Sequence, residues 1–225
     1  SQPHDIMGFQ ECMDPQRVLE DAGLAEQYAA FGGDGTGTSA TCMAFRKASW
    51  TLLGHGFEYV AEDSHVQYFG KRAAQWMRLR HTESGMVVFF MNHHGPLPIN
   101  SGGRCGGAAT AHHLLQVAVK HAHRGDAVVL VGDFNADASS STVRHLEQRL
   151  LRAYTGRALG GIDSVFSNVG KSSVAARANL GTGGSDHDAL SVVLDLGGAP
   201  GTARPAAEDL RFLLAGTPRP GWSVA

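Results

Sequence analysis

The chain has 225 residues, of which 43% are hydrophobic and 18% charged, and its formal net charge is −2. This composition is that of a folded protein and excludes a disordered chain, and the length suits one large domain or two small ones. The apolar runs are too short to cross a bilayer, so we expect a soluble protein. Three cysteines are too few for a disulfide scaffold, and we expect them to be free.

Charge is distributed unevenly along the chain. Residues 1–70 contain three basic and ten acidic residues, whereas residues 71–157 contain eleven basic and five acidic residues. Solvated charged faces explain such a pattern without any function. The alternative interpretation is a middle segment suited to an anionic ligand.

The first half of the chain contains mainly strand patterns. Residues 5–10 form a short apolar run, and Asp14-Pro15 predicts the start of a helix whose apolar spacing continues as far as Ala29. A glycine-rich loop is expected over residues 31–37. Further strands are expected at residues 41–45, 50–53, 57–60, 76–80 and 86–92.

Helices and strands alternate in the second half. Apolar residues keep helical spacing over residues 111–122, and Gly125 suits the position just beyond a helix end. Serines at 139–141 predict a second helix start. The expected strands lie at residues 127–131, 162–166 and 189–196. Together with the hairpin-like strand pairs, this order predicts an α/β fold with a mixed sheet.

A polar cluster follows each apolar strand. Its members are Glu11, His94, Asp133, Asn135, Asp163, Asp186 and His187. Because a sheet presents such residues along one edge, we expect them to form a single site. Carboxylate and amide oxygens suit Mg²⁺, with Mn²⁺ or Ca²⁺ as alternatives. The histidines suit proton transfer near neutral pH.

These motifs resemble, in their order, those of the endonuclease/exonuclease/phosphatase superfamily, which includes deoxyribonuclease I, apurinic endonucleases, sphingomyelinases and inositol-polyphosphate phosphatases. The motifs are GFQE at 8–11, NHH at 92–94, GDFN at 132–135, ID at 162–163 and SDH at 185–187. The resemblance extends over roughly residues 5–196. It implies a four-layered α-β-β-α sandwich, in which two mixed sheets pack face to face and are flanked by helices.

The resemblance also implies roles for the acidic and amide residues. Glu11 and Asp186 correspond to metal ligands. Asp133 and Asn135 correspond to the pair that aligns the attacking water and contacts the phosphate. The implied chemistry is in-line attack of water on phosphorus, in which the metal and the histidines neutralise the negative charge that develops on the oxygens.

The histidines receive roles from the same resemblance. His187 corresponds to the catalytic histidine on the phosphate oxygen, held by Asp163, and His94 to a second catalytic histidine of the nuclease and sphingomyelinase branches. The segment around Trp76 resembles an arginine-rich strand entry. We therefore expect Arg72 and Arg78, together with Asn92 of the NHH motif, to bind substrate; for the arginines, a solvated strand face is an equally good interpretation.

The domain organisation follows from the same comparison. Members of the superfamily have a strand before the first acidic motif, and only four residues precede Asp5 here. We therefore expect residues 1–197 to form one domain that lacks its first strand, in a partial, monomeric chain. Residues 198–225 are rich in glycine, proline and alanine and are expected to form a tail with one short helix near residues 210–214.

The expected function is divalent-metal-dependent hydrolysis of a phosphate ester, most simply a phosphodiester as in nucleases and sphingomyelinases. Nucleic acids, phospholipid headgroups and sugar phosphates all stay open as substrates, and so does the compartment. The alternative is a catalytically impaired fragment or paralogue that binds phosphate or protein. A secreted sugar- or lipid-binding domain is a weaker alternative, because simple binding does not need an oriented histidine such as His187 beside Asp163.

Overall fold

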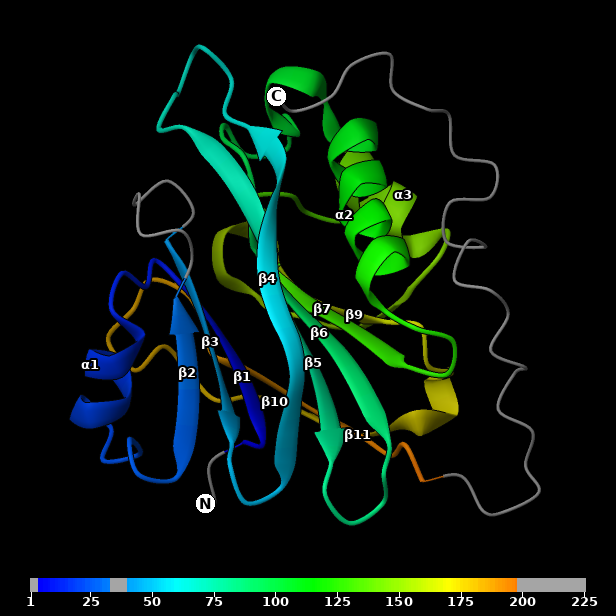
Figure 1. Cartoon of the computed structure of the whole chain (residues 1–225). Helices are drawn as coiled ribbons and strands as arrows, with labels where there is room; N and C mark the ends of the chain where they lie inside the picture. The colour runs from blue at the N-terminus through cyan, green and yellow to red at the C-terminus, as the bar shows by residue number, and fades with distance from the viewer. Residues whose placement is uncertain (1–3, 33–39, 198–225) are drawn as a thin grey trace.

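The structure, a computed structural model, describes residues 4–32 and 40–197 (Figure 1). Its largest element is a six-stranded mixed sheet in the order β4-β5-β6-β7-β9-β8. Its strands are β4 (Trp50–Glu62), β5 (Lys71–His81), β6 (Val87–His94), β7 (Ala127–Asp133), β8 (Leu151–Thr155) and β9 (Asp163–Ser167). Strands β6 and β7 are parallel, and the other neighbouring pairs are antiparallel. The predicted mixed sheet is therefore confirmed.

The second layer consists of two small antiparallel sheets. One has the order β1-β3-β2, with β1 at Ile6–Gln10, β2 at Tyr28–Gly32 and β3 at Thr41–Arg46. The other pairs β10 (Val174–Asn179) with β11 (Leu190–Leu194). This corrects the expectation of two mixed sheets: in the part of the chain that the structure describes, one sheet is mixed and the layer opposite it is divided.

In the described part of the chain, three α-helices flank these sheets, α1 (Pro15–Asp21), α2 (Gly107–His121) and α3 (Ser141–Glu147). Helix α1 is shorter than predicted, because the chain turns at Gly23, whose φ is +67°. Residues 28 and 29, which the helical spacing included, and residues 31 and 32, which were expected in a glycine-rich loop, instead belong to β2 and pair with β3. The predicted serine cap of the later helix is confirmed, since Ser140 Oγ accepts a hydrogen bond from the Val143 amide.

Three hydrophobic clusters separate four layers. Leu114 of α2 and Leu146 of α3 pack with Phe89 of β6 on one face of the large sheet. Phe90 of β6, on the opposite face, packs with Phe45 of β3 between the two sheet layers. A third cluster lies between α1 and the three-stranded sheet. The α-β-β-α layering is thus confirmed (Figure 1). No helix in the described ranges is long and apolar enough to span a membrane.

Strand β1 is held closely against the large sheet. A Cβ at Gly8 would lie 2.8 Å from a methyl group of Val131, so only glycine allows this approach without a shift of that side chain. The Asn92 side chain of β6 donates hydrogen bonds to the carbonyl oxygens of Phe9 at 2.9 Å and Cys42 at 3.0 Å. These contacts connect the two sheets and bring the end of β1 beside β6 and β7.

A disulfide joins Cys12, just after β1, to Cys42 on β3. The expectation of free cysteines is therefore wrong for these two residues, while Cys105 is free. The two cysteines are 30 positions apart in the sequence, and only the β1–β3 register brings their Cα atoms to 5.5 Å. This bond fixes the segment that directly follows Glu11.

Candidate active site

Three adjacent strands place three of the predicted site residues at one edge of the large sheet. In the parallel β6–β7 pair His94 lies opposite Asp133, and in the antiparallel β7–β9 pair Asp133 lies opposite Asp163. Strands β6 and β7 end at this edge and β9 begins there. The register of the sheet therefore assembles the centre of the site.

His187 and Asp163 form a hydrogen-bonded pair. The Nδ1 atom of His187 lies 2.9 Å and 3.1 Å from the two carboxylate oxygens of Asp163. Burial alone would lower the pKa of His187, but the hydrogen bond and negative charge of Asp163 outweigh burial and raise it. The pair leaves Nε2 of His187 as the ring nitrogen available to a substrate, 3.9 Å from Oδ2 of Asp133.

Asp133 is a buried carboxylate between two histidines. Its Oδ2 atom lies 3.6 Å from Nε2 of His94 and 3.9 Å from Nε2 of His187. Burial raises the pKa of Asp133 to about 6, the amide of Asn135 opposes this shift, and the charges of Asp163 and Glu11 add to it. A carboxylate that is costly to ionise in this way is stabilised by a nearby cation.

The loop after β7 is locked against the loop after β6. The Asn135 amide donates to Oδ1 of Asp133 at 2.7 Å, and its side-chain Nδ2 donates to the Gly95 carbonyl at 3.0 Å. The Gly95 amide donates to the Asp133 carbonyl at 2.7 Å. Asn135 has a φ of +46°, a conformation uncommon outside glycine. The two loops therefore hold Asp133 and Asn135 in one fixed arrangement.

The two adjacent histidines of β6 have different environments. His93 is fully buried, and Nδ1 of its ring bonds the Ala73 carbonyl at 2.9 Å. Burial lowers the pKa of His93 to about 4. Burial, and secondarily the charge of Arg72, lowers the pKa of His94 to about 3. His94 is thus a neutral imidazole near Asp133, and in the described ranges its buried Nδ1 has no hydrogen-bond partner.

The two acidic residues predicted as metal ligands lie at the exposed margin of the site. Glu11 directly follows β1 and has a φ of +55°, and it is close enough for its charge to raise the pKa of Asp133. Asp186 is also exposed, and its charge raises the pKa of the adjacent His187. Both residues add negative charge around the buried carboxylates.

Ligand atoms of Asp133, Asp163 and His187 all lie within 4.8 Å of one another and could hold a metal ion. The donor set fits a divalent cation for two reasons. Carboxylate oxygens are the ligands that Mg²⁺ prefers. In addition, burial raises the pKa of Asp133 to about 6, so its negative charge is unfavourable without a nearby cation. The predicted divalent metal is therefore compatible with the site.

The structure does not bring the three predicted substrate-binding residues to the opening of the site. Arg72 is buried in a two-point ion pair with Asp63, at 2.9 Å and 3.0 Å. Arg78 makes a similar pair with Asp126, which precedes β7 and so lies at the end of this strand opposite to the site. Asn92 is fully buried between the sheets. All three side chains are engaged within the fold.

Sequence reasoning missed Asp63. Its carboxylate accepts hydrogen bonds from Arg72, from the Phe69 amide and from the Leu97 amide, so it holds the loops after β4 and β6 together. Asp63 is fully buried. Because Leu97 lies only three residues after His94, its hydrogen bond to Asp63 holds the chain close to the site. The available signal was an aspartate at the end of one hairpin strand and an arginine near the start of the next.

Comparison with known proteins identifies the family. The Endonuclease/Exonuclease/phosphatase family matches residues 1–211. The chain belongs to this family, as its four-layered fold and the order of its motifs had suggested. Among curated proteins, none matches the chain.

Solved structures share the fold at low sequence identity. A mannosyl-6-phosphatase from Bacteroides thetaiotaomicron is 17% identical with a TM-score of 0.62, over 84% of this chain and 85% of that one. A family member from Bacteroides vulgatus is 18% identical with a TM-score of 0.66, over 84% and 83% of the two chains. D. rerio TDP2, solved with a single-strand DNA product, is 18% identical with a TM-score of 0.58, over 84% of each chain.

Proposed function

We propose that this protein hydrolyses a phosphate ester, most simply a phosphodiester, with a divalent cation and an attacking water. The observation that carries the proposal is the convergence on Asp133 of two imidazoles, one of them oriented by Asp163. A binding module has no need for a histidine fixed in this way. Hydrolysis needs such a histidine, because a positioned proton donor stabilises the charge that develops during the reaction.

The His187–Asp163 pair acts on the phosphate. The carboxylate keeps the proton on Nδ1 and raises the pKa of the ring, so Nε2 carries a proton over a wider pH range. From Nε2, His187 donates a hydrogen bond to a phosphate oxygen as negative charge develops there. Asp163 acts through His187 by fixing the orientation of its ring.

Asp133 and Asn135 position the attacking water. The Asp133 carboxylate accepts a hydrogen bond from the water and orients it for in-line attack on phosphorus. The side chain of Asn135 contacts the phosphate. His94, neutral at physiological pH, donates from Nε2 to another phosphate oxygen. The interlocked loops after β6 and β7 keep these groups in place without a substrate.

A bound divalent cation would neutralise phosphate charge and polarise the ester. We propose that Glu11 and Asp186 hold it at the exposed margin, which leaves Asp163 paired with His187. An ion held by Asp133, Asp163 and His187 is the alternative that their close ligand atoms support. Titration of Mn²⁺ by isothermal calorimetry distinguishes the two: Glu11→Gln weakens binding most in the first arrangement, and His187→Ala in the second.

The decisive experiment is hydrolysis of bis(p-nitrophenyl) phosphate and of p-nitrophenyl phosphate in Mg²⁺. We expect turnover of the diester, loss of turnover with EDTA, and loss in the His187→Ala variant. Faster hydrolysis of the monoester would identify a phosphomonoesterase, the activity named for the Bacteroides thetaiotaomicron relative. Phosphate binding without turnover of either compound would instead identify a binding module and contradict the proposal.

A further inference from the structure

Two loops beside His94 carry exposed apolar side chains. Val66, Tyr68 and Phe69, in the loop between β4 and β5, are 87%, 53% and 69% exposed. Ile99, in the loop after β6, is 42% exposed. Together these four residues form an apolar rim, and Figure 1 shows that the β4–β5 loop projects beyond the strands of the large sheet. Single exposed apolar residues are ordinary, but a group of them beside a site marks a binding surface.

The buried carboxylate of Asp63 fixes the apolar rim to the site. Its two oxygens accept hydrogen bonds from the Phe69 amide at 2.9 Å and the Leu97 amide at 2.8 Å. The Ser64 amide donates to the Leu97 carbonyl at 2.9 Å, so the two loops form one unit. Leu97 follows His94 by three residues, and three residues of chain span at most about 10 Å. The rim is therefore held at a set, short distance from the candidate active site.

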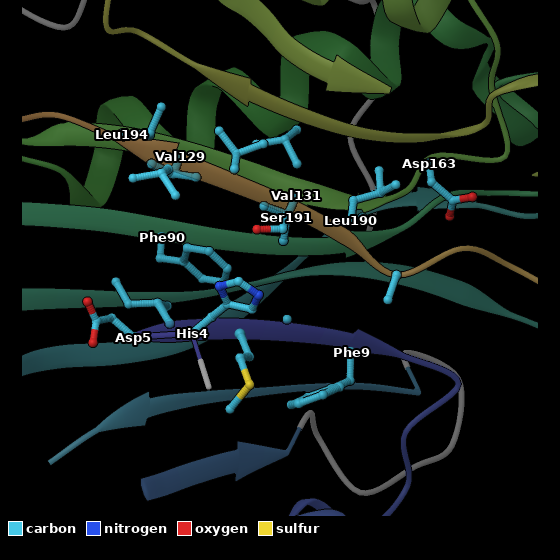
Figure 2. Close-up of a pocket in the computed structure, with 18 of the residues that line it drawn as sticks. His4, Asp5, Phe9, Phe90, Val129, Val131, Asp163, Leu190, Ser191 and Leu194 are labelled. Atoms are coloured by element: carbon cyan, nitrogen blue, oxygen red, sulfur yellow. The ribbon is translucent and has the colours of Figure 1, made fainter. Parts of the chain in front are cut away.

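A further exposed apolar residue, Leu159, lies across the site from the rim. It belongs to the loop that joins the end of β8 to Asp163, the first residue of β9. Its φ is +46°, a conformation that is uncommon for leucine. Leu180 and Val193, in contrast, line the gap between β1 and β11 that Figure 2 shows, and they are not part of the rim. Apolar side chains thus flank the opening of the site on two sides.

Charge and shape determine which partner suits the rim. Nucleic acid is bound through many basic contacts, yet Arg72 is buried in its ion pair and Arg104, in the loop after β6, pairs with Glu62 at 3.3 Å. Val66 and Ile99 have no ring on which a base could stack. The rim extends over two loops, so one small leaving group would not contact all of it. A lipid surface provides an extended apolar layer directly beneath its phosphate esters.

We propose that the apolar rim docks this protein on a zwitterionic phospholipid surface, and that the ester presented to the site is that of a phospholipid. Val66, Phe69 and Ile99 enter the layer at the boundary between headgroups and acyl chains. Tyr68, whose hydroxyl donates to Glu62 at 2.9 Å, lies at the level of the headgroups, where an amphipathic ring is favoured. The choice of substrate rests on the proposed function, whereas the docking itself does not.

Flotation of the full chain with phosphatidylcholine vesicles in EDTA tests the docking. We expect the wild type to float with the vesicles and to do so at high salt as well, because the contact is apolar. Val66→Ser combined with Phe69→Ser should lower the partition coefficient by about ten-fold or more. Phe57→Ser, at an exposed aromatic residue within β4, is the matched control and should leave it unchanged. Failure of the proposed function would not alter these results, because EDTA already removes the cation that turnover needs.

A Phe69→Trp variant reports the contact directly. Relative to the wild type, its added fluorescence should shift to the blue on vesicles and should be quenched by lipids with brominated acyl chains. Absence of flotation in the wild type, or equal flotation of the double serine variant, would overturn the proposal. So would binding of oligothymidine that the double variant loses, which indicates a nucleic-acid surface, or self-association that it loses, which indicates a second copy.

Discussion

The Nδ1 atom of His187 lies 2.9 Å from Oδ2 of Asp163, although the two residues are 24 positions apart in the sequence. This contact determines which nitrogen of His187 faces a substrate. It also raises the pKa of the ring, against the opposing effect of burial. The first residue of β9 thereby controls both the direction and the charge of a histidine in the loop before β11.

Replacement of His187 by alanine should therefore abolish most activity without unfolding the protein. We expect kcat/KM for the phosphodiester to fall by about 10²–10⁴-fold, the usual contribution of a positioned acid or base. The ring is only partly buried, so the thermal transition should change little. His123→Ala is the matched control, because this exposed residue lies beside Asp126 at the opposite end of β7. Near wild-type turnover in His187→Ala would refute the assignment.

Ionisation of Asp133 should destabilise the cation-free protein as pH rises. Its folded pKa of about 6 exceeds the ordinary value of 3.8, so the cost of the buried charge grows as pH rises from 3.8 to 6, is small at pH 4 and is complete above pH 7. That cost is on the order of 3 kcal/mol. In EDTA, Asp133→Asn should therefore be more stable than the wild type at pH 8, with a smaller or reversed difference at pH 4.

Urea unfolding at the two pH values measures this difference directly. Asp21→Asn, at an exposed position on α1, is the control and should shift stability equally at both. A destabilised Asp133→Asn protein at pH 8 would show that the hydrogen bonds accepted by Asp133 outweigh the cost of its buried charge.

The Cys12–Cys42 disulfide should contribute substantially to stability. Its ends are separated by 30 residues, and loop-closure entropy for such a ring corresponds to about 3–4 kcal/mol. The double variant Cys12→Ser, Cys42→Ser should have a free energy of unfolding lower by about 3–4 kcal/mol. Reductant should lower the free energy of unfolding of the wild type by the same amount. Cys105→Ser should change neither the free energy of unfolding nor its sensitivity to reductant. A reductant-insensitive urea midpoint would contradict the prediction.

Gly95→Ala should damage the site through the backbone. A Cβ at this position would lie 1.9 Å from the Phe134 carbonyl oxygen, so the loops after β6 and β7 would have to separate. Because a displacement of about 1 Å costs on the order of 10²-fold in rate, we expect at least that loss in kcat/KM. Gly170→Ala is the control, since a Cβ there meets only the Ser172 hydroxyl at 3.7 Å. Equal activity of both variants would show that the loops are not interlocked.

Several features of the fold were readable from sequence because they depend on local pattern. The apolar runs before His94 and Asp133 correspond to β6 and β7, and the serine cap at Ser140 begins α3. The placement of polar residues at the ends of apolar runs also predicted that Asp133, Asp163 and His187 would meet. Neighbouring strand ends share one edge of a sheet, so the order of the motifs was sufficient for this inference.

Other features depend on which distant segments pair. Helical spacing continued as far as Ala29, yet residues 28–32 form β2, because β3 supplies a strand partner that the local pattern cannot reveal. The guanidinium group of Arg72 suits phosphate binding, yet the β4–β5 hairpin places the buried carboxylate of Asp63 against it. The same is true of Cys12 and Cys42, whose disulfide depends on the β1–β3 register.

The sequence by itself determined the family, the alternation of strands and helices, and the chemical types at the site. Tertiary structure alone decided the charge states of the two site histidines. His94 is neutral because it is buried, and His187 holds its proton more tightly because Asp163 faces Nδ1. Burial and pairing with a residue distant in the chain are properties of the folded surroundings, and both shift the pKa values of these histidines more than their sequence neighbours His93 and Asp186 do.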